Sequence, residues 1–233
     1  MIENSLITKC TYNIVLCIDG TGTMKPFIEN LKNNISHFYE SFAKEIDECF
    51  GDYISFNVRV KAIVFRDYLF DGEEAMVESP FYELPSEEEA FVKFINGIEA
   101  SGGGDNPENG LEALYYAMQS DFTSGFKDRQ IIVLFSDADA LPLKERAGEG
   151  NYPSDMVDMD GFYKTWACQS QTSKSNLRER NKRLLMFAPH NSFYEKLGHS
   201  FNRCLFIPES GQFGRGDIDF ENIIDYILRV ATN

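Results

Sequence analysis

The chain has little positive charge and few histidines. Its 233 residues carry 22 Lys and Arg against 37 Asp and Glu, which gives a formal net charge of −15, and only 3 residues are His. Such an excess of negative charge disfavours phosphate backbones and anionic membrane surfaces as partners, because both would be repelled. We therefore expect no nucleic-acid partner and no membrane partner, whereas cations and basic proteins are compatible with the charge.

Cysteine patterns and long apolar runs are also lacking. The 5 cysteines are an odd number and include no C-x-x-C pair, which argues against a disulfide framework and against a zinc site. No apolar stretch reaches the roughly 18 residues that a membrane-spanning helix needs. The segment Met1–Tyr12 does not combine a basic region with an apolar stretch, so no signal peptide is visible. We therefore expect a soluble, cytoplasmic protein.

The apolar residues that are present alternate between two patterns. Short continuous apolar runs are typical of strands buried on both faces of a parallel sheet, and apolar residues every three or four positions are typical of helices. The expected strands are Asn13–Asp19, Gln130–Ser136, Leu184–Ala188 and Cys204–Ile207, and Tyr53–Phe70 is expected to be one long strand or a hairpin arm. The expected helices are Pro26–Cys49, Ser86–Ile98 with a capping box formed by Ser86 and Glu89, Glu108–Met118 and Ile218–Val230. This order predicts a single α/β domain over 1–233, with a doubly wound (Rossmann-like), mostly parallel central sheet and helices on both faces.

Oxygen-bearing side chains follow the expected strands. Asp19, Thr21 and Thr23 follow the first strand, Asp137 follows Gln130–Ser136, and Asp105 comes directly after three glycines. Because ligands bind beyond the carboxyl ends of the strands in such sheets, these five residues are candidate ligands of one divalent cation. An oxygen-only set suits Mg²⁺, Mn²⁺ or Ca²⁺, and a cation would relieve the repulsion between the carboxylates. Aspartates at strand ends also serve as helix caps and turn formers, which is the alternative interpretation.

Two segments are strongly charged. Between Asp71 and Glu108 there are eleven acidic residues and a single Lys93, and between Lys174 and Arg183 there are five basic residues and only Glu179. We interpret both segments as solvated surface; a contact with a complementary partner is the alternative.

The motifs resemble those of von Willebrand factor type A domains. Asp19-x-Thr21-x-Thr23-Met24 is similar to the D-x-[ST]-x-[ST]-M motif that opens the metal-ion-dependent adhesion site of that family. The strand that ends in Asp137 is similar to a later strand of the family, which ends in T-D or S-D. The stretch Gly102–Glu108, with Phe65-Arg66-Asp67 upstream, resembles intracellular members that carry Y-R-D and G-G-G-D-x-P-E. The resemblance extends over roughly Tyr12 to Val230.

The resemblance implies a binding module and not an enzyme. Asp19, Thr21 and Thr23 would be first-loop metal ligands, direct or through water, and Asp137 would act through water. The family usually offers a threonine from the middle loop, where this chain has Asp105; an extra anionic ligand would weaken the pull of the cation on a partner's carboxylate. The family implies a divalent metal, Mg²⁺ first, that bridges to an acidic group of a protein partner, and such domains often serve as adaptors to ATPases or kinases.

Two enzyme families that open with D-G-T are the alternatives. Haloacid-dehalogenase-type phosphatases, which are metal-dependent phosphohydrolases, use D-x-D-G-T with the first Asp as nucleophile, and this chain has Cys17 at that position. A cysteine in the middle of an apolar strand is a poor thiolate. An α/β-hydrolase would need a serine in G-x-S-x-G, which does not occur in this sequence.

Overall fold

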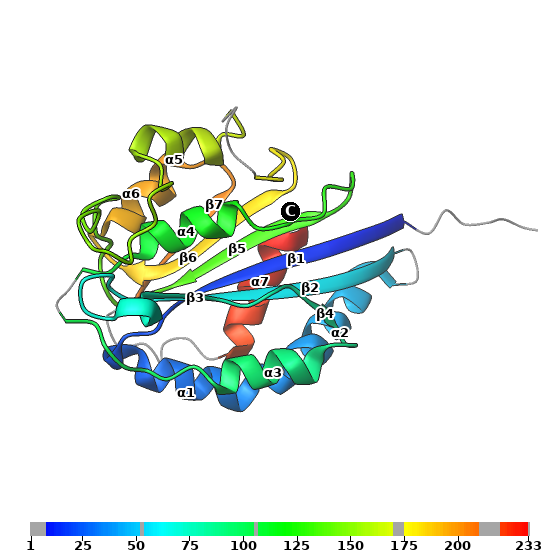
Figure 1. Ribbon diagram of the computed structural model, residues 1–233. Helices are drawn as coiled ribbons and strands as arrows, with labels where there is room; N and C mark the ends of the chain where they lie inside the picture. Colours follow the sequence, from blue (N-terminus) through cyan, green and yellow to red (C-terminus); the bar gives the residue numbers. More distant parts are fainter. Residues whose placement is uncertain (1–7, 52–53, 105–106, 170–174, 210–219, 233) are drawn as a thin grey trace, which may run out of the picture.

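A central, mostly parallel sheet lies between two layers of helices (Figure 1). The computed structural model describes residues 8–51, 54–104, 107–169, 175–209 and 220–232. In this part of the chain the strands form one sheet in the order β3-β2-β1-β5-β6-β7, and β4 also pairs with β2. The α/β, doubly wound fold that the sequence predicts is therefore confirmed.

Parallel strands make up most of the sheet, and one of them forms the edge opposite β3. They are β1 (Thr8–Asp19), β2 (Ile54–Phe65), β5 (Arg129–Phe135), β6 (Lys182–Pro189) and β7 (Cys204–Glu209). Strand β1 pairs along both edges, with β2 and β5, and helices cover both of its faces. Ile14 and Ile18 belong to the core on one face, and Val15 and Cys17 belong to the core on the other. This double burial explains why the strand is a continuous apolar run instead of an alternating one.

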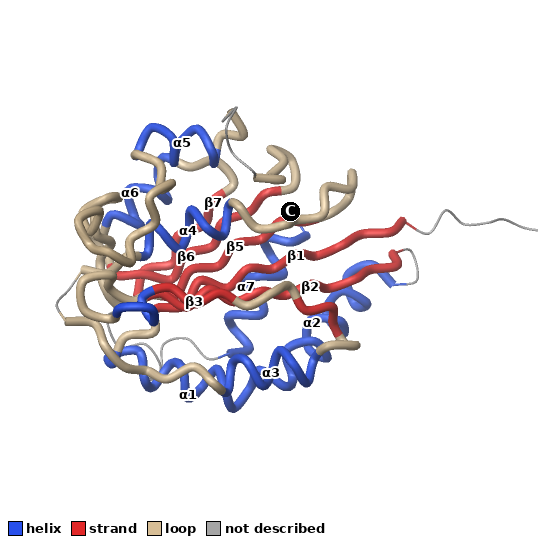
Figure 2. The backbone as a smooth tube through the Cα atoms, in the orientation of Figure 1, coloured by secondary structure: helices blue, strands red, loops and turns tan. Residues whose placement is uncertain are grey.

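The helices divide between the two faces (Figure 2). One face carries α1 (Lys25–Asn34), α2 (Phe38–Phe50), α3 (Glu88–Asn96) and α7 (Phe220–Thr232). The other face carries α4 (Gly110–Met118), α5 (Met159–Trp166) and α6 (Phe193–Ser200). Within the described ranges, no helix is long and apolar enough to cross a membrane.

The single long helix expected over Pro26–Cys49 is wrong, because a 3-10 turn at Ile35–His37 separates α1 from α2. The amide of Asn34 donates to the carbonyl oxygen of Asn30 at 2.8 Å. Such local side-chain bonds compete with the regular helix, which accounts for the break. Ile35 stays buried in the turn, so the apolar spacing that suggested one helix continues across it.

The expected capping box at Ser86 is also wrong. Helix α3 begins at Glu88, and the hydroxyl of Ser86 donates to the carbonyl oxygen of Glu83 at 3.0 Å instead of accepting from the helix. The strand expected over Tyr53–Phe70 ends at Phe65. Two antiparallel strands on β2, β3 (Met76–Glu78) and β4 (Tyr82–Leu84), are too short for a periodicity to reveal them.

The parallel strands end at a common edge. Asp19 of β1 pairs with Phe65 of β2, and Ile18 pairs with Phe135 of β5. The loops that follow these strands therefore start side by side, which places the candidate ligands of the first and last loops next to one another.

Candidate metal centre

Asp19 is the buried end of the candidate site. Its side chain is fully shielded from solvent. Oδ1 accepts from the backbone N–H of Thr21 at 3.0 Å and from the Thr21 hydroxyl at 2.7 Å, and Oδ2 accepts from the Ser136 hydroxyl at 2.7 Å. Burial raises the pKa of Asp19 to about 6, against the lowering effect of these bonds, and the nearby charge of Asp137 raises it further. The Asp19 carboxylate thus accepts several hydrogen bonds, but none of the groups that shift its pKa is positively charged.

The oxygens of the first and last loops form a chain that leads outward from Asp19. The hydroxyl oxygens of Thr21 and Thr23 lie 3.4 Å apart, and the Thr23 hydroxyl donates to Oδ1 of Asp137 at 3.1 Å. Thr21 is buried, Asp137 is half-buried and Thr23 is exposed. Burial also raises the pKa of Asp137, against the hydrogen bond from Thr23. The structure therefore brings together four of the five expected residues.

The spacing of these oxygens fits a small divalent cation. In an octahedral site with Mg²⁺–oxygen bonds of roughly 2.0–2.1 Å, adjacent ligand oxygens lie about 3 Å apart. The Thr23–Asp137 contact of 3.1 Å and the Thr21–Thr23 contact of 3.4 Å are close to that value. The donor set contains only oxygen, and it opens toward solvent at Thr23. Among the described residues, no group of three or more His, Cys, Asp or Glu side chains is placed to hold a metal, and the oxygens next to the Asp19 and Asp137 carboxylates are the hydroxyls of Thr21 and Thr23.

The glycine-rich loop after α3, which contains Gly102, Gly103 and Gly104, packs directly against the first loop, which joins β1 to α1. The Ser101 N–H donates to the Gly20 carbonyl oxygen at 3.0 Å, and the Gly22 N–H donates to the Gly102 carbonyl oxygen at 3.4 Å. Gly103 has a φ of 71°, and a Cβ there would lie 2.7 Å from Cγ2 of Thr21. Only glycine allows this approach. Asp105, the fifth expected ligand, lies outside the described residues.

Asp71 holds the glycine-rich loop from the other side. Its carboxylate accepts from the Gly103 N–H at 3.1 Å and from the Asp67 N–H at 3.0 Å. The sequence does not single out Asp71, because the residue stands in an acidic segment of the kind that is typical of solvated surface. Ser136 was also missed, although its position directly before Asp137 was a usable signal.

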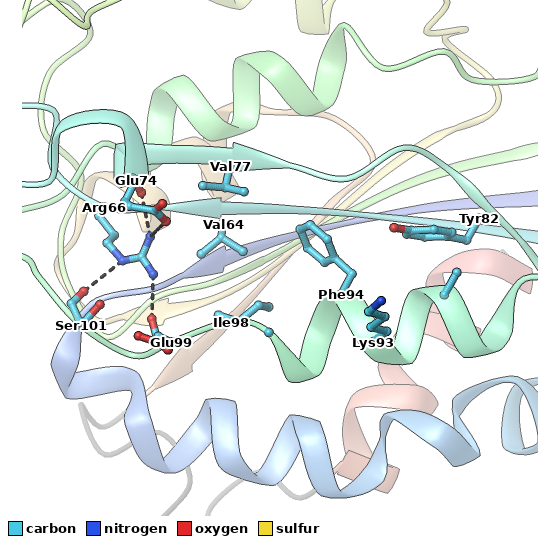
Figure 3. Close-up of a pocket in the computed structure, with 12 residues that line it drawn as sticks. Val64, Arg66, Glu74, Val77, Tyr82, Lys93, Phe94, Ile98, Glu99 and Ser101 are labelled. Atoms are coloured by element: carbon cyan, nitrogen blue, oxygen red, sulfur yellow. Dashed lines mark hydrogen bonds and ion pairs between the residues drawn. The ribbon is translucent and has the colours of Figure 1, made fainter.

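Arg66 joins three segments around the site (Figure 3). Its Nε donates to the carbonyl oxygens of Gly20 (3.1 Å) and Ser101 (3.0 Å), Nη1 donates to that of Glu74 (2.7 Å), and Nη2 donates to that of Glu99 (2.7 Å). The side chain is buried. One guanidinium group therefore fixes the first loop, the glycine-rich loop and the β2–β3 connection relative to one another. In Figure 3 it stands at one end of a cavity of about 790 Å³ between α3 and the edge of the sheet.

A buried ion pair connects the loop between β5 and α5 with the segment that follows β2. Arg146 donates through Nε to Oδ1 of Asp67 at 2.8 Å and through Nη2 to Oδ2, and Asp67 is fully buried. Asp67 Oδ1 also accepts from the Leu69 N–H at 2.7 Å. A two-pronged pair with an additional hydrogen bond holds its geometry well, so it orients the segment that follows β2. The Phe65-Arg66-Asp67 motif thus contributes two positioning residues and no candidate ligand.

Cys17 stands where the phosphatase motif has its nucleophile. The thiol is fully buried in β1 and points to the Ala113 carbonyl oxygen of α4, with the sulfur 3.7 Å from it. Burial raises the pKa of the Cys17 thiol well above its ordinary value. A protonated thiol without access to solvent is a core residue and is unsuited to nucleophilic attack.

Comparisons with known proteins establish the fold and leave the family open. No family model matches the chain. It is 24% identical over 130 residues to an ariadne-like RING finger protein of Acanthamoeba polyphaga mimivirus, a match that covers 56% of this chain and 11% of that protein. Crystal structures of the pilus adhesin SpaC from Lactobacillus rhamnosus GG, in the open conformation and in a second form, superpose with TM-scores of 0.52 and 0.50. Each is 12% identical, and the match covers 95% of this chain and 30% of the adhesin chain. At that identity the likeness concerns the fold alone.

Proposed function

We propose that this chain is a divalent-metal-dependent protein-binding module of the von Willebrand A type. The observation that carries the proposal is the chain of oxygens from Asp19 through Thr21 and Thr23 to Asp137, with contacts of 2.7, 3.4 and 3.1 Å. These four side chains would hold Mg²⁺ or Mn²⁺, and the bound cation would supply a coordination position for an acidic oxygen of the partner.

The residues of the chain have distinct parts in this function. Asp19 provides the charge that holds the cation, and Ser136 and the Thr21 N–H fix the orientation of its carboxylate. Thr23 and Asp137 lie at the solvent side, where the partner would enter. Arg66 keeps Gly20 and Ser101 in register, so the ligand oxygens are positioned before the cation arrives. Such preorganisation reduces the cost of ordering the loop on binding.

Apolar side chains beside the site favour a protein partner over a free anion. Leu69 and Phe70 are 43% and 52% exposed. The Phe70 ring covers Gly104, since a Cβ on that glycine would lie 2.5 Å from it, and the Arg146 guanidinium carbon lies 5.9 Å from the ring centre. An exposed aromatic ring next to a charged contact is a common element of protein interfaces. The partner would therefore present an acidic residue with an apolar neighbour.

The metal is tested first. Titration calorimetry with Mg²⁺ and with Mn²⁺ should give one site per chain in the parent protein and no binding in Asp19→Asn. Asp47→Asn removes a carboxylate from an exposed position of α2 and should bind as the parent does. Circular dichroism checks that both variants are folded. A parent protein that binds neither ion at millimolar concentration would refute the metal site.

Partner binding is tested second. Proteins captured by the parent protein in Mg²⁺ should be absent in chelator and absent with Asp19→Asn, but present with Asp47→Asn. Phe70→Ser should weaken capture without changing the calorimetric metal affinity. If Asp19→Asn is folded, has lost the metal and still captures every partner, recognition does not pass through the cation.

A further inference from the structure

Three arginines surround a second hollow, at the opposite end of the sheet from the candidate metal centre. The hollow has a volume of about 410 Å³ and is lined by Arg183, Arg203, Cys204, Leu205, Arg229 and Val230. Arg183 belongs to the start of β6, Arg203 directly precedes β7, and Arg229 belongs to the last turn of α7. Arg183 pairs with Ile131 and Cys204 pairs with Leu184, which places the hollow at the amino ends of these strands.

The positive charge around Arg183 is poorly neutralised. Burial, together with the positive charges of Arg129 and Arg203, lowers the pKa of the Arg183 guanidinium to about 10, and no carboxylate is among the groups that shift it. Its Nη1 donates to the carbonyl oxygens of Arg180 and Lys182 at 3.0 and 2.8 Å. The group stays protonated at neutral pH, so the fold holds a cation in surroundings that disfavour it.

Arg203 has a carboxylate partner that it shares with a lysine. Glu179 lies 3.7 Å from Arg203, but one of its oxygens also pairs with Lys182 at 2.6 Å, so one carboxylate serves two cations. Arg129, which does not line the hollow, donates to the Ala231 carbonyl oxygen at the end of α7, where the helix dipole favours a cation. This contact accounts for the position of Arg129 but not for the three arginines that line the hollow. Arg203 has a φ of 55°, in the left-handed region that is unfavourable for residues with a side chain.

We propose that this hollow binds a small phosphate monoester, with the phosphate held by Arg183, Arg203 and Arg229 and the organic part lying on Leu205 and Val230. Guanidinium groups match phosphate oxygens in a two-pronged geometry, and a phosphate monoester carries about two negative charges near pH 7, more than a carboxylate offers. A volume of about 410 Å³ suits a small ligand. The net charge of −15 would repel a long polyanion far more than a small dianion.

The probes are phenyl phosphate, inorganic phosphate and benzoate, titrated into the whole chain without divalent cations, so that the result is independent of the metal centre. Saturable binding is expected, with phenyl phosphate tightest because only it fills both the charged and the apolar parts. Benzoate, with one charge, should bind more weakly than phenyl phosphate. Equal affinity for benzoate and phenyl phosphate, or no saturation by phenyl phosphate at millimolar concentration, would overturn the proposal.

Three variants distinguish binding in the hollow from a nonspecific effect of nearby positive charge. Arg203→Gln and Arg229→Gln should each lower the affinity for phenyl phosphate about tenfold or more, because each removes charged hydrogen bonds. Arg180→Gln is the matched control: it removes the same charge nearby, but Arg180 lies over the Phe126 ring in the adjacent hollow and does not line this one. Thermal melts confirm that all three variants are folded. Arg203 lines both hollows, whereas Arg229 lines only the proposed one, so the decisive comparison is between Arg180→Gln and Arg229→Gln. If Arg180→Gln loses as much affinity as Arg229→Gln, the binding is nonspecific or lies in the adjacent hollow, and the assignment fails.

Discussion

Replacing Arg66 by Met tests whether one side chain keeps the candidate metal centre in shape. The guanidinium group donates to four backbone carbonyl oxygens, at 3.1, 3.0, 2.7 and 2.7 Å, and belongs to a buried residue. Met has a similar length and no donor, so the substitution removes all four hydrogen bonds without leaving a large void. It also removes a buried charge, which offsets part of the loss.

The expected magnitude follows from these contacts. Hydrogen bonds to charged groups contribute roughly 1.5–3 kcal/mol each, but the four share one group, and carbonyls at the cavity can regain water, so the sum is not additive. We expect the free energy of unfolding to fall by about 3–5 kcal/mol. That is a large part of the roughly 5–15 kcal/mol of a typical domain, and the protein should still fold.

Urea unfolding and calorimetry give the two readouts. Arg66→Met should lose stability and also bind Mg²⁺ more weakly, because Gly20 and Ser101 are no longer held together. Arg66→Lys should recover part of the stability but less of the affinity, since a point charge cannot reach all four carbonyls. Arg178→Met, at an exposed position, should change stability by less than about 0.5 kcal/mol. A loss below about 1 kcal/mol for Arg66→Met would refute the reasoning.

Three further substitutions test other parts of the structure. Gly103→Ala should lower the free energy of unfolding by about 1–3 kcal/mol more than Gly51→Ala in urea titrations, because both glycines have positive φ but only the first would place a Cβ 2.7 Å from Thr21; equal losses would contradict the steric argument. Burial raises the pKa of Glu112 above its ordinary value of 4.5, so its contribution to stability is greatest below that value and is lost as the pH rises toward the folded pKa. The parent protein should therefore lose stability relative to Glu112→Gln as the pH rises from acid to neutral. A stability difference that is independent of pH would show that folding does not raise the pKa of Glu112. The Tyr194 hydroxyl is buried and has no hydrogen-bond partner among the described residues, so Tyr194→Phe should keep the melting temperature or raise it slightly; a marked fall would mean that a buried water satisfies the hydroxyl.

The part of the site that could be predicted is the part that the strand pattern fixes. Asp19 ends a strand that must be apolar on both faces, and Asp137 follows another such strand, so the parallel order alone brings them to one edge. Thr21 and Thr23 follow within the same loop. No knowledge of side-chain packing was needed to expect these four residues together.

The supporting residues could not be predicted in the same way, because their partners are backbone atoms or distant side chains. The four acceptors of Arg66 are carbonyl oxygens, which have no signature in a sequence. Asp67 and Arg146 are separated by 79 positions, and nothing in either segment indicates the other. The helix break at Ile35–His37 was missed because it preserves the apolar spacing on which the prediction depended.

The two ends of the sheet show the same physical situation with opposite signs. Asp19 is fully buried with a raised pKa, and the one charged group that shifts it, Asp137, has the same sign; Arg183 has a lowered pKa, and the charged groups that shift it are arginines. Asp67, by contrast, is just as buried but meets the guanidinium of Arg146. A buried charge without a counter-charge costs stability, and a fold that needed only rigidity could replace it by an apolar residue. That both ends keep such a charge beside an opening supports ligands of opposite sign, a cation at the carboxyl edge and an anion at the amino edge.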